Sequence, residues 1–140
     1  MDANEVNEMN QRVIKEFREN DGRVGGMFEG APLLLLHTVG AKSGKARINP
    51  MMYQKVGDQF AVFASMGGAP TNPAWFHNLG KNPDAEIEVG SQTLPVTAHV
   101  ADPATRQQIW EAQKANYPQF AEYEARTDRE IPVVLLTQRN

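Results

Sequence analysis

The chain has 140 residues, of which 41% are hydrophobic and 22% are charged, and its formal net charge is -3. This length and composition are typical of one globular domain, expected over residues 1–140, and the lack of an extended basic run argues against nucleic acid as a partner. Because the chain has no cysteine, disulfides, thiolate metal sites and cysteine nucleophiles are excluded, and any redox chemistry requires a bound cofactor.

The first predicted element is an N-terminal amphipathic helix over residues 3–20, which ends at Asp21-Gly22. Its apolar residues recur at helical spacing, at Val6, Met9, Val13, Ile14 and Phe17. We expect this apolar stripe to pack on the core. The alternative is weak association with a membrane surface, although the polar face is mixed in charge rather than basic.

The remaining elements are read from turn residues and apolar patterns. Short strands separated by tight turns predict antiparallel pairing, in an α+β fold of about six strands that form a small barrel or curled sheet with helices around it. The helix at 73–79 is predicted from Asn72-Pro73, which is typical of an N-cap residue followed by proline at the first helical position. In order, the expected segments are strands at Leu33–Val39, 46–56 and 59–65, the helix at 73–79, a hairpin of 85–89 and Gln92–Val100, helices at 103–116 and 118–125, and a buried strand at 131–137.

Location and metal binding can also be read from the sequence. Residues 1–5 lack the basic segment that precedes the apolar part of a signal peptide, and no apolar run approaches the ~20 residues of a membrane span. We therefore expect a cytoplasmic protein. The three histidines, His37, His77 and His99, are too far apart to form a metal-ligand motif, so no metal is expected.

The most informative segment is a basic turn that directly follows the first predicted strand. It reads Gly40-Ala41-Lys42-Ser43-Gly44-Lys45-Ala46-Arg47. Glycines let backbone N–H groups converge on an anion, and the guanidinium of Arg47 can hold a phosphate or carboxylate through two hydrogen bonds. On an acidic chain, this turn predicts a local anion pocket. The alternative is a solvated turn without function, since neither a phosphate-loop motif nor a dinucleotide fingerprint is present.

Two further groups of residues are candidates for a binding site. The first runs from Ala64-Ser65-Met66-Gly67-Gly68 into Ala74-Trp75-Phe76-His77-Asn78, where a helix start offers free N–H groups and the aromatic side chains offer a flat surface. Asn78 could bond the edge of a ring, whereas Trp75 could equally be a core residue. The second group is the aromatic stripe of Tyr117, Phe120 and Tyr123, which is either core or the lid of a pocket.

These motifs, in this order, resemble the deazaflavin-dependent nitroreductase family of actinobacterial type, and the resemblance extends from Phe17 to Leu136. Members bind coenzyme F-420, an 8-hydroxy-5-deazaflavin with a phosphate and a polyglutamate tail. The resemblance implies a split β-barrel related to flavin-mononucleotide-binding proteins. The motifs that carry it are Gly22-Arg23-Val24-Gly25-Gly26, Glu29-Gly30-Ala31-Pro32, Gly40-Ala41-Lys42-Ser43-Gly44 with Arg47 and Pro50, Ser65 with Gly67-Gly68-Ala69, Asn72-Pro73-Ala74-Trp75 with Asn78, Asn82-Pro83, Thr127-Asp128-Arg129 and Ile131-Pro132.

The resemblance also implies roles for individual residues. The phosphate and anionic tail would be held by Ala41, Lys42, Ser43 and Arg47. The deazaflavin ring would lie beside Ile48, Asn49, Pro50, Met51 and Met52, in a cleft completed by Ala64, Ser65, Met66, Ala74, Trp75, Phe76, His77 and Asn78. The substrate pocket above the ring would contain the candidate catalytic residues Ser65, Tyr117 and Tyr123.

Three positions depart from the family pattern. Met66 stands where members often carry lysine, which would remove one contact to the phosphate or tail. Phe120 replaces a tyrosine, and Met52 replaces an aromatic residue that occurs in other members. Because these changes touch the pocket, reduction of nitroimidazole prodrugs does not follow from the resemblance.

The function implied is hydride transfer from reduced F-420 to an electron-poor acceptor, which would be a quinone, an enone or a nitroaromatic compound. Ser65 would hydrogen-bond the developing oxyanion, and Tyr117 or Tyr123 would do likewise or supply a proton. Two alternatives remain open at this point, an FMN-dependent oxidoreductase of the same barrel type and a non-catalytic F-420 carrier. The sequence leaves the oligomeric state open, with a homodimer among the options.

Overall fold

The computed structural model describes residues 3–139, with side chains from Asn7 onward except that of Met27. Met1 and Asp2, on which the expectation about a signal peptide rests, lie outside the described residues, as does the side chain of Val6. Within residues 3–139, no helix is both long and apolar enough to cross a bilayer.

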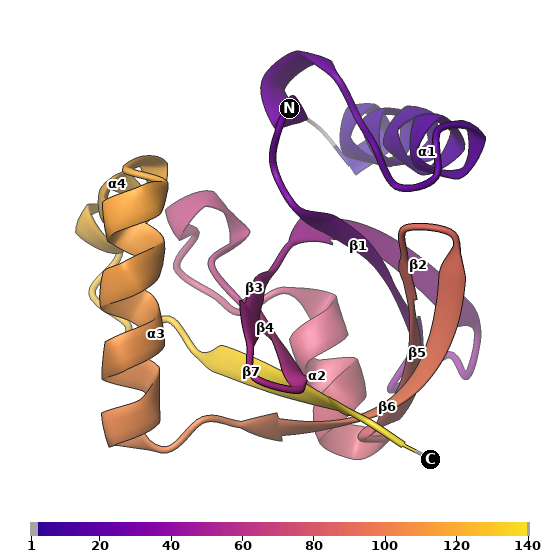
Figure 1. Ribbon diagram of the computed structural model, residues 1–140. Coiled ribbons are helices and arrows are strands. Elements are labelled where there is room, and N and C mark those ends of the chain that lie inside the picture. The colour runs from indigo at the N-terminus through magenta and orange to yellow at the C-terminus, as the bar shows by residue number, and fades with distance from the viewer. Residues whose placement is uncertain (1–2, 140) are drawn as a thin grey trace.

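The described chain forms one antiparallel sheet of seven strands and four α-helices (Figure 1). The strand order is β2-β1-β5-β6-β7-β4-β3. The helices are α1 (Ala3–Glu19), α2 (Ala74–Lys81), α3 (Pro103–Asn116) and α4 (Gln119–Ala125), and the strands are β1 (Leu33–Val39), β2 (Ala46–Met52), β3 (Gln54–Val56), β4 (Gln59–Phe63), β5 (Asp84–Val89), β6 (Gln92–Val100) and β7 (Val133–Gln138). These elements confirm the predicted α+β class.

The predicted strand over 46–56 is wrong in one respect, because the structure divides it at Tyr53 into β2 and β3. β2 lies at one edge of the sheet and β3 at the other, although a single residue separates them. The two edges must therefore meet at Tyr53, whose backbone N–H donates to the carbonyl of Pro32 at 3.1 Å. This change of pairing partner curls the sheet into a barrel, as Figure 1 shows.

Helix α2 packs one face against the core of this barrel. Its buried residues Trp75 and Leu79 belong to the same core cluster as Leu34 and Leu36 of β1 and Val62 of β4. A second cluster lies under α3 and α4, where Trp110 and Phe120 pack on Phe63. The position of α2 is what brings its other face beside the β1–β2 turn.

The apolar stripe of α1 packs on the sheet, as predicted. Val13, Ile14 and Phe17 are buried against Leu33 and Leu35 of β1. These three side chains are therefore enclosed within the protein, whereas that of Met9 is partly exposed.

An ion-pair cluster fastens the end of α1 to the sheet. The guanidinium of Arg18 donates to both carboxylate oxygens of Glu88 on β5, at 3.1 and 2.8 Å, and Nε2 of His37 lies 2.6 Å from Oε2 of Glu88. The hydrogen bond from Arg18 lowers the pKa of Glu88 below its ordinary value of 4.5, against the opposing effect of burial.

Glu88→Gln should therefore destabilise the fold by an amount that depends on pH. The pKa of Glu88 is lowered in the folded state, so the stabilisation is complete above the ordinary value of 4.5 and is lost as the pH falls through the folded-state pKa. The cost at neutral pH is up to about 1 kcal/mol, because the side chain of Arg18 is about half exposed. Urea unfolding of both proteins at neutral and acidic pH measures the difference, and a difference that does not shrink in acid would contradict the role of Glu88.

Candidate functional site

The basic turn is a compact loop between β1 and β2. The N–H of Gly40 donates to the carbonyl of Lys45 at 2.8 Å, and the N–H of Gly44 donates to the carbonyl of Gly40 at 2.9 Å. The hydroxyl of Ser43 accepts from the N–H of Lys45 at 3.2 Å. Lys42, Lys45 and Arg47 remain exposed, so the loop presents their charges to solvent from a fixed backbone.

The buried side chain of Asn78 locks this loop onto α2. Its Oδ1 accepts from the N–H of Ala41 at 2.9 Å, and its Nδ2 donates to Oγ1 of Thr38 at 3.1 Å. Nζ of Lys81 donates to the carbonyl of Ala41 at 2.7 Å. The amide of Asn78, which was expected to bond the edge of a ring, holds the turn in this structure, and the backbone of Ala41 is engaged as well.

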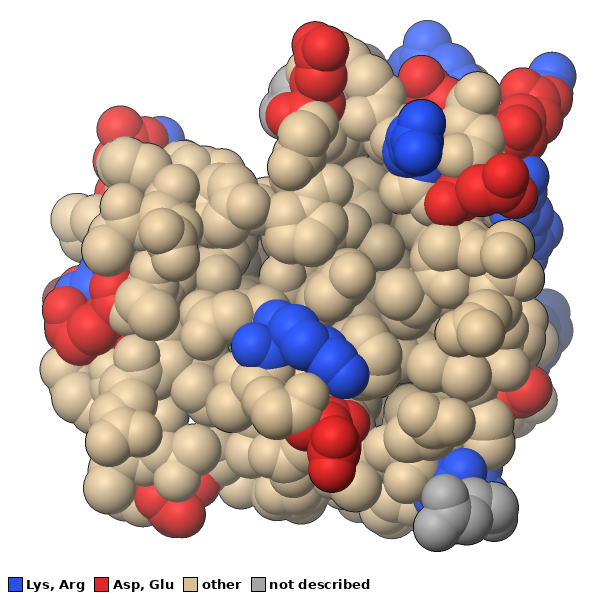
Figure 2. All heavy atoms as spheres, viewed as in Figure 1, with Lys and Arg blue, Asp and Glu red and all other residues tan. Residues whose placement is uncertain are grey.

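The loop, β2 and α2 together enclose a cleft of about 700 Å³. This volume is within the range of small-molecule sites, and the described residues that line the cleft include two cations and no acidic residue, which suits a ligand with an anionic group. It is lined by Gly40, Ala41, Lys42, Ser43, Arg47, Asn49, Ala74, His77 and Asn78. On the face in Figure 2, Lys and Arg side chains are scattered among Asp and Glu side chains.

Several predicted cofactor residues lie elsewhere. Trp75 is 8% exposed and belongs to the barrel core, and Ala64 is fully buried. Met51 packs on the barrel core, whereas Ile48 and Met52 pack on the cluster under α1. Ile48, Met51 and Met52 are only partly buried, and none of these five residues lines the 700 Å³ cleft.

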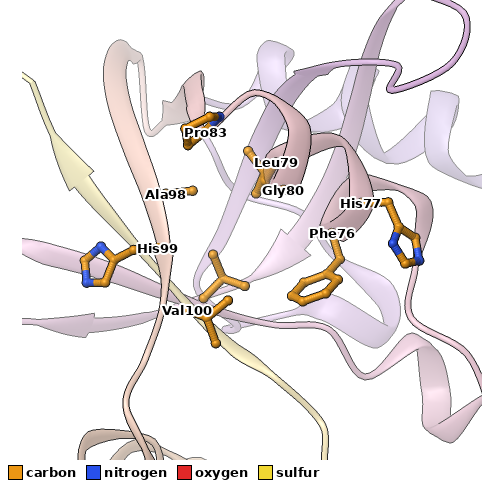
Figure 3. A pocket seen from close by; sticks show the side chains of 9 residues that line it. Phe76, His77, Leu79, Gly80, Pro83, Ala98, His99 and Val100 are labelled. Carbon is orange, nitrogen blue, oxygen red and sulfur yellow. The ribbon is translucent and has the colours of Figure 1, made fainter.

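Phe76 lines a different pocket, of about 320 Å³, between α2 and β6 (Figure 3). Its ring lies opposite Val100 there, and His99 lies across the strand. The helical period explains the separation, because Ala74 and Asn78 share the face toward the basic loop while Phe76 points roughly 160° away from Asn78. His77 borders both pockets.

Ser65 begins a loop that is held in place by Arg129. The guanidinium of Arg129 donates to the carbonyls of Ala64, Ser65 and Ala69 at 3.1, 3.0 and 2.9 Å, and to Oδ1 of Asn72 at 2.7 Å. Asn72 is therefore not the N-cap of α2 as predicted; Pro73 takes that position, without a side-chain cap. Sequence reasoning placed Arg129 in a motif but missed its role, which only the spatial contact reveals.

The aromatic stripe lies beside this loop. Phe120 is a core residue, with its ring 5.4 Å from that of Phe63, while Tyr117 and Tyr123 are half-buried around it. Gly68 approaches α4 so closely that an added Cβ would lie 2.6 Å from the carbonyl oxygen of Tyr123. The loop after Ser65 and Tyr123 are thus neighbours, although neither these two residues nor Tyr117 lines the 700 Å³ cleft.

One face of the molecule is recessed. Figure 2 shows a notch between the lobe that contains α4 and the lobe that contains α1. Met66 is 57% exposed at the start of the loop, in a left-handed backbone conformation with φ 47°. A non-glycine residue in that conformation is uncommon, and such residues gather at functional sites.

The chain matches a family model described as F420H(2)-dependent quinone reductase over residues 9–138. The chain belongs to this family. An F420H(2)-dependent quinone reductase of Mycobacterium tuberculosis is 44% identical over 129 residues, which cover 88% of this chain and 85% of the relative. Membership makes the protein an oxidoreductase that depends on coenzyme F-420, and it confirms the resemblance seen in the sequence.

Solved structures confirm the split β-barrel. An F420-H2 dependent reductase (FDR-A) has a TM-score of 0.68 and 39% identity, and the match covers 75% of this chain and 93% of that one. A protein described as a domain-swapped dimer has a TM-score of 0.70 and 36% identity, with 95% of this chain and 97% of that chain covered.

Proposed function

We propose that this family member reduces a quinone with F-420 bound in the 700 Å³ cleft. The observation that carries the proposal is the cleft itself, in which a basic loop fixed by Asn78 faces α2 and the described lining residues include no acidic one. Reduced F-420 supplies a hydride when bound. The protein's contribution is to bind and orient the reactants and to stabilise the charge that develops on the acceptor.

The residues of the cleft share this work with Ser65, Tyr117 and Tyr123, which lie outside its lining. Lys42 and Arg47 bind the phosphate through charge-assisted hydrogen bonds, and Arg47 suits a bidentate contact. Asn49, Ala74 and His77 border the space beside the loop. The hydroxyl of Ser65 hydrogen-bonds the reduced quinone oxygen, and the hydroxyl of Tyr117 or Tyr123 does likewise or supplies a proton.

Titration of the protein with F-420 and with FMN tests this proposal. We expect F-420 to bind and FMN to bind much more weakly, because the basic loop suits a longer anionic ligand. Lys42→Ala or Arg47→Ala should lower F-420 affinity by about one to two decades, since a hydrogen bond between charged groups is worth roughly 1.5–3 kcal/mol. Binding should also weaken as salt is added.

The same titration distinguishes the rivals. Equal affinity for FMN and F-420 would favour a flavin oxidoreductase. Unchanged F-420 affinity in both Lys42→Ala and Arg47→Ala would show that the loop does not bind the coenzyme. Tight F-420 binding without turnover of any quinone would indicate a carrier. Circular dichroism of the variants provides the control that the fold survives.

Assembly into a homodimer is a further part of the proposal. It is supported by the relative that is described as a domain-swapped dimer and that covers almost the whole chain. Sedimentation velocity of the purified protein would decide between monomer and dimer.

A further inference from the structure

The pocket between α2 and β6 differs from the cleft in its chemistry. Its volume of about 320 Å³ is at the lower end of the range of small-molecule sites. Among the described residues that line it there is no lysine, arginine, aspartate or glutamate, whereas the cleft and the two hollows that share residues with it contain lysine or arginine. Its apolar lining consists of Phe76, Leu79, Pro83, Ala98, Val100 and Val134.

The two principal walls of this pocket are apolar side chains of α2 and β6. Helix α2 contributes the ring of Phe76, and β6 contributes Ala98 and Val100 (Figure 3). Because neighbouring residues of a strand point to opposite faces, the side chain of His99 points away from the pocket, as Figure 3 shows. The imidazole of His77, whose ring centre lies 5.8 Å from that of Phe76, is therefore the polar side chain at its edge.

This arrangement indicates what kind of molecule the pocket would bind. Val100 is 58% exposed, more than any other large apolar residue among those described. Covering such a side chain beside a concave apolar wall removes apolar surface from water, which favours binding. A charged ligand would lose hydration there without gaining an ion pair, so the lining suits an uncharged molecule with one or two aromatic rings.

Helix α2 is the wall that the pocket shares with the cleft. His77 borders both, and Asn78 on the cleft side holds the basic loop through the N–H of Ala41. A ligand that packs on Phe76 and Leu79 adds contacts to α2 in the position from which it holds the loop. Because a ligand shifts the population toward the arrangement that it binds best, such a ligand favours the arrangement that forms the cleft.

We propose that this pocket is a second ligand site, which takes a small uncharged aromatic molecule and acts on the coenzyme cleft through α2. The rings of the ligand would pack between Phe76 and Val100, with a hydroxyl or carbonyl oxygen toward His77. Binding itself goes beyond the proposed function and needs no coenzyme. The effect on the cleft rests on the proposed function, because it requires F-420 to bind there.

Three naphthalene probes of nearly equal size test binding in the absence of coenzyme. Naphthol is uncharged at neutral pH, naphthoate is an anion and naphthylmethylamine is a cation. An NMR titration follows the methyl signals of Leu79, Val100 and Val134 in the pocket, with Leu35 under α1 as the remote reference. We expect naphthol to shift the three pocket signals with a Kd of about 0.1–1 mM, and the charged probes to bind at least about tenfold more weakly.

Two substitutions alter the pocket, and a third is the matched control. An added Cβ at Gly80 has open space around it, so Gly80→Leu places a side chain at the pocket without a clash. Val100→Asp puts a carboxylate into the apolar wall, and Val39→Asp makes the same change at an exposed valine that does not line the pocket. The two pocket variants should each lower naphthol affinity by about three- to tenfold, and Val39→Asp should leave it unchanged. Thermal melts confirm that each variant is folded.

The effect on the cleft is measured by titrating F-420 with and without saturating naphthol, using the fluorescence of the coenzyme. We expect F-420 affinity to rise about fivefold when naphthol is bound, and naphthol affinity to rise by the same factor when F-420 is bound, because coupling between two sites is reciprocal. Val100→Asp should bind F-420 as the wild type does in the absence of naphthol, and should lose most of the rise at the same naphthol concentration.

Several results would overturn the inference. They are the absence of any shift in the pocket methyl signals, the same naphthol affinity in both pocket variants as in the wild type, an F-420 affinity that naphthol leaves unchanged, and competition between the two ligands, which would place naphthol in the cleft. Failure of the proposed function gives a different result. In that case F-420 does not bind the wild type, and the effect on the cleft fails with it, while naphthol still shifts the pocket signals of the coenzyme-free protein.

Discussion

Ser65→Ala is expected to lower kcat for quinone reduction by about ten- to a thousandfold while leaving F-420 affinity nearly unchanged. The substitution removes one hydroxyl with little change in volume. If that hydroxyl stabilises the oxygen that becomes negative as hydride arrives, its loss raises the barrier more than it weakens binding. Steady-state kinetics with a quinone and a coenzyme titration measure the two effects separately.

Tyr117→Phe and Tyr123→Phe are the matched substitutions, since each removes only a hydroxyl from a half-buried ring. A reduced rate in either variant would identify that tyrosine as a partner of the acceptor. If the rings serve only to pack on Phe120, both variants should keep full specific activity and change only in melting temperature. Full specific activity in all three variants would refute the assignment of the acceptor pocket.

Arg129→Ala is expected to destabilise the protein by about 2–4 kcal/mol and to loosen the loop that begins at Ser65. The guanidinium of Arg129 bonds three carbonyls and the side chain of Asn72, and its removal leaves those acceptors without their donor. Urea unfolding measures the stability, and limited proteolysis within residues 64–72 measures the loosening.

Arg129→Lys is the informative control for this result. A lysine keeps the charge but cannot present donors in the planar arrangement that reaches several acceptors at once, so it should recover only a minor part of the stability. Because Ser65 sits in the same loop, both variants should also lose quinone turnover under conditions where they remain folded. Wild-type stability and protease resistance in Arg129→Ala would show that the loop holds itself in place.

Much of the local structure could be predicted from neighbouring residues. β1 and β6 have the predicted bounds, and α3 begins as expected where the carboxylate of Asp102 accepts from the N–H of Thr105 at 2.9 Å. Helix caps, tight turns and apolar runs involve residues that are close together in the sequence, and for that reason they can be predicted from it.

The candidate site could be predicted only in part. The basic loop was recognisable because its glycines and cations are consecutive, and the cleft does form around Lys42 and Arg47. The division of α2 into three faces was not visible in the run from Ala74 to Asn78, where core, loop contact and second pocket alternate with the helical period. Sequence analysis therefore assigned Trp75 and Phe76 to one site with Ala74 and Asn78, whereas in the structure they lie on other faces of α2.

The sequence by itself determined the family, the need for a bound cofactor and the position of the basic loop, because these depend on residue types and their order. The tertiary structure alone decided that the strand over 46–56 breaks at Tyr53, that Asn78 locks the loop, and that Arg129 holds the segment after Ser65. Each of these depends on a contact between groups 21 or more residues apart, such as Tyr53 with Pro32 and Arg129 with Ser65. Pairing over such distances is set by how the barrel closes and packs, which no short stretch of sequence encodes.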